Sequence, residues 1–111
     1  MRLELFRSGV PALIPRGSID WRQWAYEDVR RQGCSPLTDK VWIEVTPTCK
    51  DVRSRQFPTV WWPVMQQCVD ALISAEVLPS WDIVHGITVH RARATGELSL
   101  TFVATDSSEP F

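Results

Sequence analysis

Three aspartates are the residues of this sequence best suited to hold a catalytic metal ion. Asp51 lies in a polar segment, Asp70 comes near the end of an apolar stretch, and Asp82 follows a Pro-Ser-Trp sequence. Carboxylate oxygens are preferred ligands of Mg²⁺, and the bound ion activates water and stabilises charge on a phosphate. A catalytic site would need Asp82 beside Asp51 or Asp70. Alternatively, Asp70 is a structural carboxylate that accepts hydrogen bonds, and Asp51 is a solvated loop residue.

The histidines and cysteines do not have the spacing of a metal site. His85 and His90 are five residues apart on a predicted strand, so they point to opposite faces unless the strand contains a bulge. Cys34, Cys49 and Cys68 form no Cys-x-x-Cys or Cys/His pair at zinc spacing. We therefore expect reduced thiols, with Cys68 packed in a core, and no bound cofactor.

One local cluster of basic residues has the chemistry to contact phosphate. It consists of Lys50, Arg53 and Arg55, with Arg91 and Arg93 as further candidates. The formal net charge of the whole chain is −1. Proteins that bind duplex DNA usually have a basic balance, because Lys and Arg replace the counterions of phosphates. The total charge argues against a general DNA-binding protein, and a solvated loop without a partner explains the cluster equally well.

Apolar periodicity predicts the elements that position these residues. We expect strands at 1–7, 40–46, 83–91 and 97–105, and helices at 19–32 and from about 61 to 73. The last two strands are predicted to form a hairpin with a turn at 94–96. The order β-α-β-α-β-β indicates an α+β fold, with a small mixed sheet packed against two helices. We assign 1–105 to a single domain and 106–111 to a frayed tail.

No apolar stretch approaches the ~20 residues of a membrane helix, and the N-terminus lacks the apolar core of a signal peptide. A cytoplasmic protein without membrane association is expected. The sequence also contains six tryptophans. Trp is enriched at interface hot spots and is equally a large core residue, and both roles stay open here. Trp61, Trp62 and Trp81 are the candidates for contact with a protein, and the alternative for Trp81 is a core position.

Residues 56–86, QFPTVWWPVMQQCVDALISAEVLPSWDIVHG, resemble the central stretch of small proteins of the RusA family of Holliday-junction resolvases, which are common in phages and prophages. In one branch of that family an Asp-Pro-x-Asn motif precedes an aromatic-Pro pair and a helix. That helix ends in Val-Asp-Gly/Ala-Leu, and Val-Leu-Pro then leads to two or three aspartates. The matching residues here are Pro58, Trp62-Pro63, Val69-Asp70-Ala71-Leu72 and Val77-Leu78-Pro79. Asp20-Trp21 is similar to the Asn/His-Trp opening of the family's first helix.

The resemblance implies a structure-selective endonuclease that cuts four-way DNA junctions as a homodimer with Mg²⁺. The sequence departs from the family at the residues that perform this chemistry. Phe57 and Val60 stand at the positions of the motif's Asp and Asn, Gln66 stands at the family's helix Lys, and the aspartate run is Ser80-Trp81-Asp82. One carboxylate does not easily hold Mg²⁺, because the ion keeps most of its water and needs charge to be bound.

Three hypotheses follow. The first is a RusA-like protein that has lost metal-dependent cleavage and binds a protein or branched DNA, as a phage-encoded regulatory or inhibitory protein in the bacterial cytoplasm. The second is a working Mg²⁺-dependent junction endonuclease with a site rebuilt from Asp82 and Asp51 or Asp70. The third is a small α+β domain unrelated to nucleases.

Overall fold

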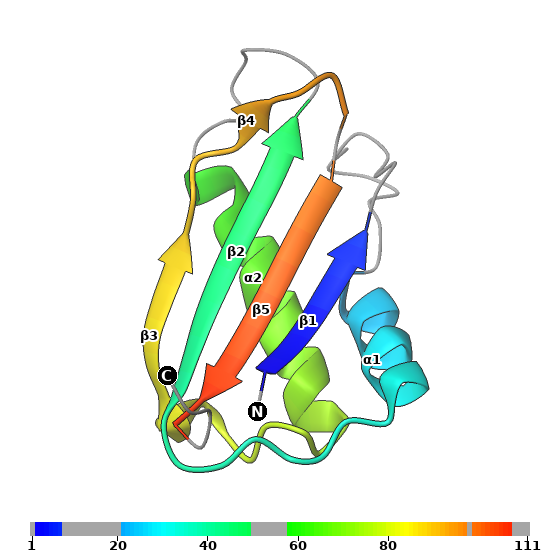
Figure 1. Ribbon diagram of the computed structural model, residues 1–111, viewed down its shortest axis with the longest axis vertical. Helices are drawn as coiled ribbons and strands as arrows, with labels where there is room; N and C mark the ends of the chain where they lie inside the picture. Colours follow the sequence, from blue (N-terminus) through cyan, green and yellow to red (C-terminus); the bar gives the residue numbers. More distant parts are fainter. Residues whose placement is uncertain (1, 8–20, 50–57, 98, 108–111) are drawn as a thin grey trace.

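The computed structural model describes residues 2–7, 21–49, 58–97 and 99–107 (Figure 1). Its elements, in chain order, are β1 (Arg2–Arg7), α1 (Trp21–Gln32), β2 (Val41–Cys49), α2 (Pro58–Ser74), the 3₁₀ turn η2 (Trp81–Ile83), β3 (Val84–Val89), β4 (Arg93–Ala94) and β5 (Ser99–Asp106). A small mixed sheet is packed against two helices, which confirms the predicted α+β fold.

The sheet has the strand order β1-β5-β2-β3, and the short β4 also pairs with β2. β5 is antiparallel to both of its neighbours, whereas β3 and β4 are parallel to β2. The predicted hairpin between the last two long strands is therefore wrong. Helix α2 connects β2 to a parallel neighbour, β3, and the residues after β3 form β4 before the chain returns as β5 between β1 and β2.

Strand β2 is longer than predicted and contains Pro47, which the sequence analysis placed in a loop. The carbonyls of Val45 and Cys49 accept hydrogen bonds from His90 and Thr95, at 2.9 and 3.0 Å. Backbone groups of alternate residues point to the same side of a strand, so the nitrogen of Pro47 also points toward β3 and β4. Pairing with β3 ends at Val45 and pairing with β4 starts at Thr48. Pro47 is tolerated because its missing N–H falls in this interval.

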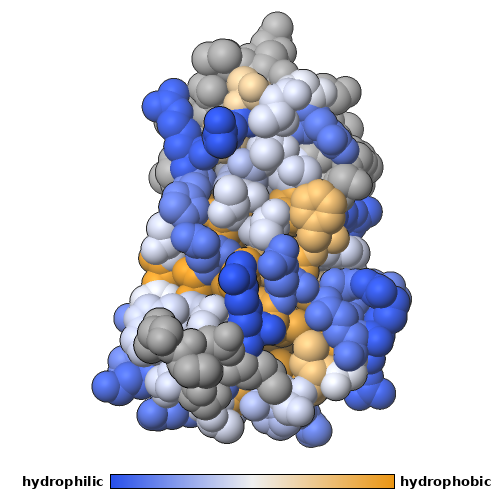
Figure 2. Space-filling view, in the orientation of Figure 1, coloured by the Kyte–Doolittle hydropathy of each residue, from blue (hydrophilic) through white to orange (hydrophobic). Residues whose placement is uncertain are grey.

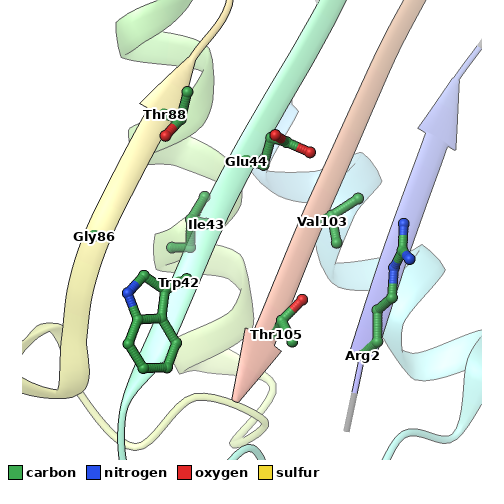
Figure 3. A pocket seen from close by; sticks show the side chains of 8 residues that line it. All are labelled: Arg2, Trp42, Ile43, Glu44, Gly86, Thr88, Val103 and Thr105. Carbon is green, nitrogen blue, oxygen red and sulfur yellow. The ribbon is translucent and has the colours of Figure 1, made fainter. Parts of the chain in front are cut away.

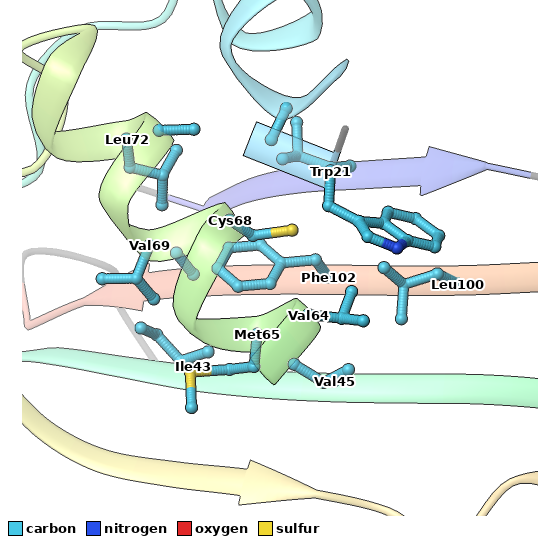
Figure 4. Close-up of a cluster of buried hydrophobic side chains, with 14 of the residues drawn as sticks. Trp21, Ile43, Val45, Val64, Met65, Cys68, Val69, Leu72, Leu100 and Phe102 are labelled. Atoms are coloured by element: carbon cyan, nitrogen blue, oxygen red, sulfur yellow. The ribbon is translucent and has the colours of Figure 1, made fainter. Parts of the chain in front are cut away.

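Both helices cover one face of the sheet, and the core lies between the two layers (Figure 4). The predicted apolar stripe of α2 is confirmed, since Val64, Met65, Cys68, Val69 and Leu72 are all buried. They meet inward-facing side chains of β2 and β5, among them Ile43, Val45, Leu100 and Phe102. Helix α1 contributes Trp21, Ala25 and Val29 to the same core. It ends at Gln32 as predicted, and Gly33 follows with a φ of 63° that favours glycine.

Helix α2 begins at Pro58, three residues before the predicted start at Trp61. Pro63 consequently lies inside the helix and not in its first turn. It lacks the N–H that would bond to the carbonyl of residue 59, which is itself in the first turn. Only one hydrogen bond near the helix start is lost, and the buried stripe that follows holds the rest of the helix on the sheet.

The C-terminal end of the domain extends further than predicted. Asp106, which the sequence analysis assigned to a frayed tail, belongs to β5 and is buried. Its carboxylate accepts a hydrogen bond from the backbone N–H of Thr38 at 2.9 Å. The N–H of Ser107 donates to the carbonyl of Lys40, also at 2.9 Å. Residues 108–111 lie outside the described chain. No helix in the described part is long and apolar enough to cross a membrane.

Candidate functional site

The residues that the RusA resemblance singles out are partly brought together on the outer flank of α2. The indole Nε1 of Trp81, in η2, donates a hydrogen bond to Oδ1 of Asp70, in the fourth turn of α2, at 3.1 Å. Both residues are exposed, and the Trp81 side chain keeps 38% of its surface. The Asp70 carboxylate thus accepts a hydrogen bond, as its structural interpretation predicts, from the tryptophan that the RusA resemblance aligns with an aspartate.

Asp82, the second predicted carboxylate, is exposed in η2 directly after Trp81. Its backbone N–H donates to Oγ of Ser80 at 3.2 Å, so Ser80 caps the short turn. Ser80 and Trp81 therefore have local structural roles. One caps the turn and the other links it to α2.

Trp62 and Gln66 continue this surface toward the start of α2. Ser74, whose Oγ accepts a hydrogen bond from Arg22 of α1 at 2.8 Å, marks the side of α2 that faces α1. Trp61 also contacts α1, through Trp21. At 100° per residue, Trp62 and Gln66 lie about 120° and about 80° around the helix from Ser74 on the side away from Trp61, toward β3, and Asp70 lies about 40° from Ser74 on the solvent side. The Trp62 side chain is 43% exposed. It precedes Asp70 by eight residues, or about 12 Å along the helix. We call Trp62, Gln66, Asp70, Trp81 and Asp82 the Trp62–Trp81 surface.

Trp61 does not belong to this surface, and its prediction as a protein-contact residue is wrong. Its side chain is fully buried, with the ring centroid 6.4 Å from that of Trp21 in an edge-on arrangement. The helical turn explains the difference, because successive residues of a helix point about 100° apart. Trp61 therefore points toward the core and α1, while Trp62 points toward solvent.

The charge of the surrounding segment is uniformly acidic. Residues 58–89, which hold α2, η2 and β3, contain no Lys or Arg and three acidic residues, Asp70, Glu76 and Asp82, a formal charge of −3. The rest of the sequence has all 12 basic residues and the other 10 of the 13 acidic ones, or +2, which gives the total of −1. The Trp62–Trp81 surface thus has exposed indoles and carboxylates without a basic residue in its own segment.

A metal site is not formed by the part of the chain that the structure describes, in which no three His, Cys, Asp or Glu residues are grouped to hold an ion. Asp51, the proposed partner of Asp82, lies outside the described residues, as do Phe57 and the predicted phosphate contacts Lys50, Arg53 and Arg55. Val60 lies in α2, but its side chain is not among those described. Arg93 pairs with Thr48 in the sheet, which brings it to the end of β2 just before Lys50.

The sheet face opposite the helices is open, and Figure 2 shows blue hydrophilic side chains on it with orange apolar residues between them. His85 and His90 both contact side chains of this face, contrary to the prediction for a regular strand. The reason is a bulge, since Val41 pairs with Val84 but Trp42 pairs with Gly86. The His85 ring centroid lies 6.4 Å from that of Trp42, and Nε2 of His90 lies 2.9 Å from Oε2 of Glu44.

An open cavity of about 330 Å³ lies on the same face, across all four long strands (Figure 3). Val103 lies between the side chains of Arg2 and Glu44, and Trp42 lies beside Gly86. The charges of this face lie close to opposite charges, since Arg2 is 3.6 Å from Glu4 and Glu44 contacts His90. The sequence analysis missed this cavity, although the alternation of exposed Trp42 and Glu44 in the predicted strand placed both on its outer face.

Comparison of the chain with models of known protein families gives no match, and comparison with curated protein sequences gives none either.

Proposed function

We propose that this chain is a RusA-like protein that no longer cleaves DNA and acts by binding a protein through the Trp62–Trp81 surface. The observation that carries the proposal is the hydrogen bond from Trp81 to Asp70. In the family, this position would hold a further aspartate for the catalytic Mg²⁺. Here a bulky indole stands in its place and uses one oxygen of Asp70, which lowers the charge and the number of free ligands that an ion would need.

The chemistry of the surface favours a protein over DNA. Phosphates bind through Lys and Arg, and the segment of α2, η2 and β3 contains neither. Exposed tryptophans, in contrast, are the side chains most enriched where proteins contact each other. Two of them, at 43% and 38% exposure, lie on this flank beside the carboxylates of Asp70 and Asp82. A partner with basic side chains and an apolar contact surface fits this combination.

The rest of the proposal comes from the family setting. The RusA resemblance supports a phage or prophage origin, a regulatory or inhibitory role in the bacterial cytoplasm, and a homodimer. Branched DNA is the alternative partner, through Lys50, Arg53 and Arg55, and a rebuilt Mg²⁺ site with Asp51 is the alternative activity.

The experiment is an assay of cleavage and binding with a synthetic four-way DNA junction, in Mg²⁺ and separately in Mn²⁺. We expect no cleavage by the wild-type chain and no binding that survives near-physiological salt, because the proposed surface repels phosphate. The double variant Phe57→Asp/Trp81→Asp, which restores two family carboxylates, is measured beside it. Gain of metal-dependent cleavage in that variant alone would support descent from an active resolvase.

A matched control is the double variant Phe57→Asp/Trp62→Asp, which adds the same two charges but replaces Trp62, which is not at a family metal position, in place of Trp81. It should stay inactive with either ion. Cleavage by the wild-type chain would overturn the proposal, and salt-resistant junction binding that is lost on replacing Lys50, Arg53 and Arg55 would identify DNA as the partner.

A further inference from the structure

The two edges of the sheet differ in how they are protected from pairing with another strand. β3 is the last strand on one side, and no described residue pairs with its outer edge. Its sequence, VHGITV, contains no Lys, Arg, Asp, Glu or Pro. Exposed edges are usually blunted by such residues, because a free row of N–H and C=O groups invites another strand. Only the bulge at His85 interrupts this edge, which leaves Gly86–Val89 regular.

The opposite edge, β1, is protected. It contains Arg2, Glu4 and Arg7. The carbonyl of Glu4 accepts a hydrogen bond from the side-chain amide of Gln32 at 3.0 Å, so α1 satisfies part of the outer edge of β1. The two edge strands of the same sheet therefore differ: β1 has charged residues and a hydrogen bond from α1, and β3 has neither charged residues nor Pro.

The backbone groups available on β3 can be identified. The N–H of His90 donates to the carbonyl of Val45 in β2, and alternate residues share this direction. The N–H and C=O groups of Ile87 and Val89 therefore point away from the sheet. Their side chains are partly buried and pack on the core from the helix side. A strand added at the usual spacing of about 4.8 Å would bond to these groups and cover the remaining apolar surface of Ile87 and Val89.

The charge around this edge specifies the added strand. Asp82 lies two residues before β3, and Asp70 is linked to η2 through Trp81. Both carboxylates are exposed near the start of β3. Trp62 and Gln66 lie on the side of α2 that faces β3, so side chains of the added strand on the helix side would meet them.

We propose that the outer edge of β3 binds an extended segment of a partner protein, in which basic side chains meet Asp70 and Asp82 and alternate apolar side chains face Trp62. The inference rests on the proposed function, because it names the form and charge of the partner at the Trp62–Trp81 surface. Main-chain hydrogen bonds supply affinity in this mode, and alternate side chains supply specificity.

The test uses capped synthetic peptides and the full-length ¹⁵N-labelled chain. The probes are Lys-Lys-Val-Thr-Val-Thr-Val, its reverse sequence, and versions of both with Glu in place of Lys. We expect a Lys peptide to slow amide exchange at Ile87 and Val89, to bind more weakly as salt rises, and to bind at least tenfold better than its Glu version. The Ile87→Pro variant removes one outward N–H without removing a bond to β2, and should weaken binding by about tenfold.

Glu4→Pro is the matched control, because the Glu4 carbonyl points outward and its N–H points the same way. It should leave peptide binding unchanged. Amide protection in the wild-type chain keeps the test valid if Ile87→Pro fails to fold. Equal binding of Lys and Glu peptides, or no binding of any, would overturn the inference. A third outcome is Lys-dependent binding that is lost in Trp62→Ala while the amides of Ile87 and Val89 stay unprotected. That result would overturn strand addition but keep the proposed function. Cleavage of the DNA junction would overturn the proposed function itself.

Discussion

At the scale of the residue, one side chain decides what β3 can present on the open face of the sheet. A Cβ atom at Gly86 would lie 2.7 Å from Cδ1 of Trp42, closer than real Cβ contacts allow. The indole therefore lies directly against the backbone of β3, although 42% of the Trp42 side chain stays exposed. Glycine at this position permits the approach, and the exposed indole in turn covers a strand segment without a side chain of its own.

The contact between Trp42 and Gly86 predicts a coupled effect on stability. Gly86→Ala should destabilise the wild-type chain by roughly 1 kcal/mol, because the exposed indole must move aside to admit the methyl group. In a Trp42→Ala background the same change should cost little, since the space above residue 86 is then empty. Urea unfolding of the two single variants and the double variant measures this coupling. Additive effects would mean that Trp42 does not restrict residue 86.

At the scale of the element, strands and helices were largely predictable but their pairing was not. The alternation of Val41, Ile43 and Val45 and the stripe of α2 both follow from local sequence, and both are confirmed. The place of β5 between β1 and β2 depends on contacts between residues about 50 to 100 positions apart, which no local pattern encodes. Pro47 and the bulge at His85 also depend on neighbouring strands. The geometry of the site could not be predicted for the same reason. The hydrogen bond from Trp81 in η2 to Asp70 in α2 depends on how the two segments pack, and the sequence gives only their order along the chain.

The end of β5 gives a prediction at this scale. Asp106 is 1% exposed, and its carboxylate accepts from the N–H of Thr38. Asp106→Ala should lower the free energy of unfolding by about 1–3 kcal/mol, because the hydrogen bond between the Thr38 N–H and the buried carboxylate is lost. Asp106→Asn keeps an acceptor oxygen and should cost less. Ser107→Ala serves as the control, since Ser107 bonds at the exposed surface to Asp39 and should change stability by no more than ~0.5 kcal/mol. Equal losses in Asp106→Ala and Ser107→Ala would contradict an anchoring role for Asp106.

At the scale of the whole molecule, the acidic residues of α2 and η2 and the sheet edge that is open to strand pairing lie on the same side of the core. The acidic flank of α2, the exposed indoles of Trp62 and Trp81 and the unprotected edge of β3 all belong to residues 58–89. The other edge of the sheet is capped by Gln32, and the open face has its charges in pairs. Among the described residues, the unprotected edge therefore lies beside the acidic flank, as the proposed protein contact requires.

The three thiols report whether this core behaves as one cooperative unit. Cys68 lies at its centre with no exposed surface, and burial raises the pKa of its thiol to about 12. Burial, and then the nearby Asp28 carboxylate, also raise the pKa of Cys34, but that side chain is only partly covered. The reactive thiolate is therefore depleted at both sites at pH 8, and access separates them.

We expect a disulfide reagent such as DTNB to modify Cys34 in the native chain within minutes at pH 8. Cys49 and Cys68 are buried and should react only at the rate of unfolding. Cys34→Ala should remove the fast phase, and Cys68→Ala should halve the amplitude of the slow phase, which Cys68 shares with Cys49. Urea below the unfolding transition should accelerate the slow phase in proportion to the unfolded population, because exposure of Cys68 requires α2 to leave the sheet. Rapid labelling of Cys68 without urea would instead mean that α2 separates from the sheet in the native state, which would contradict a single packed core.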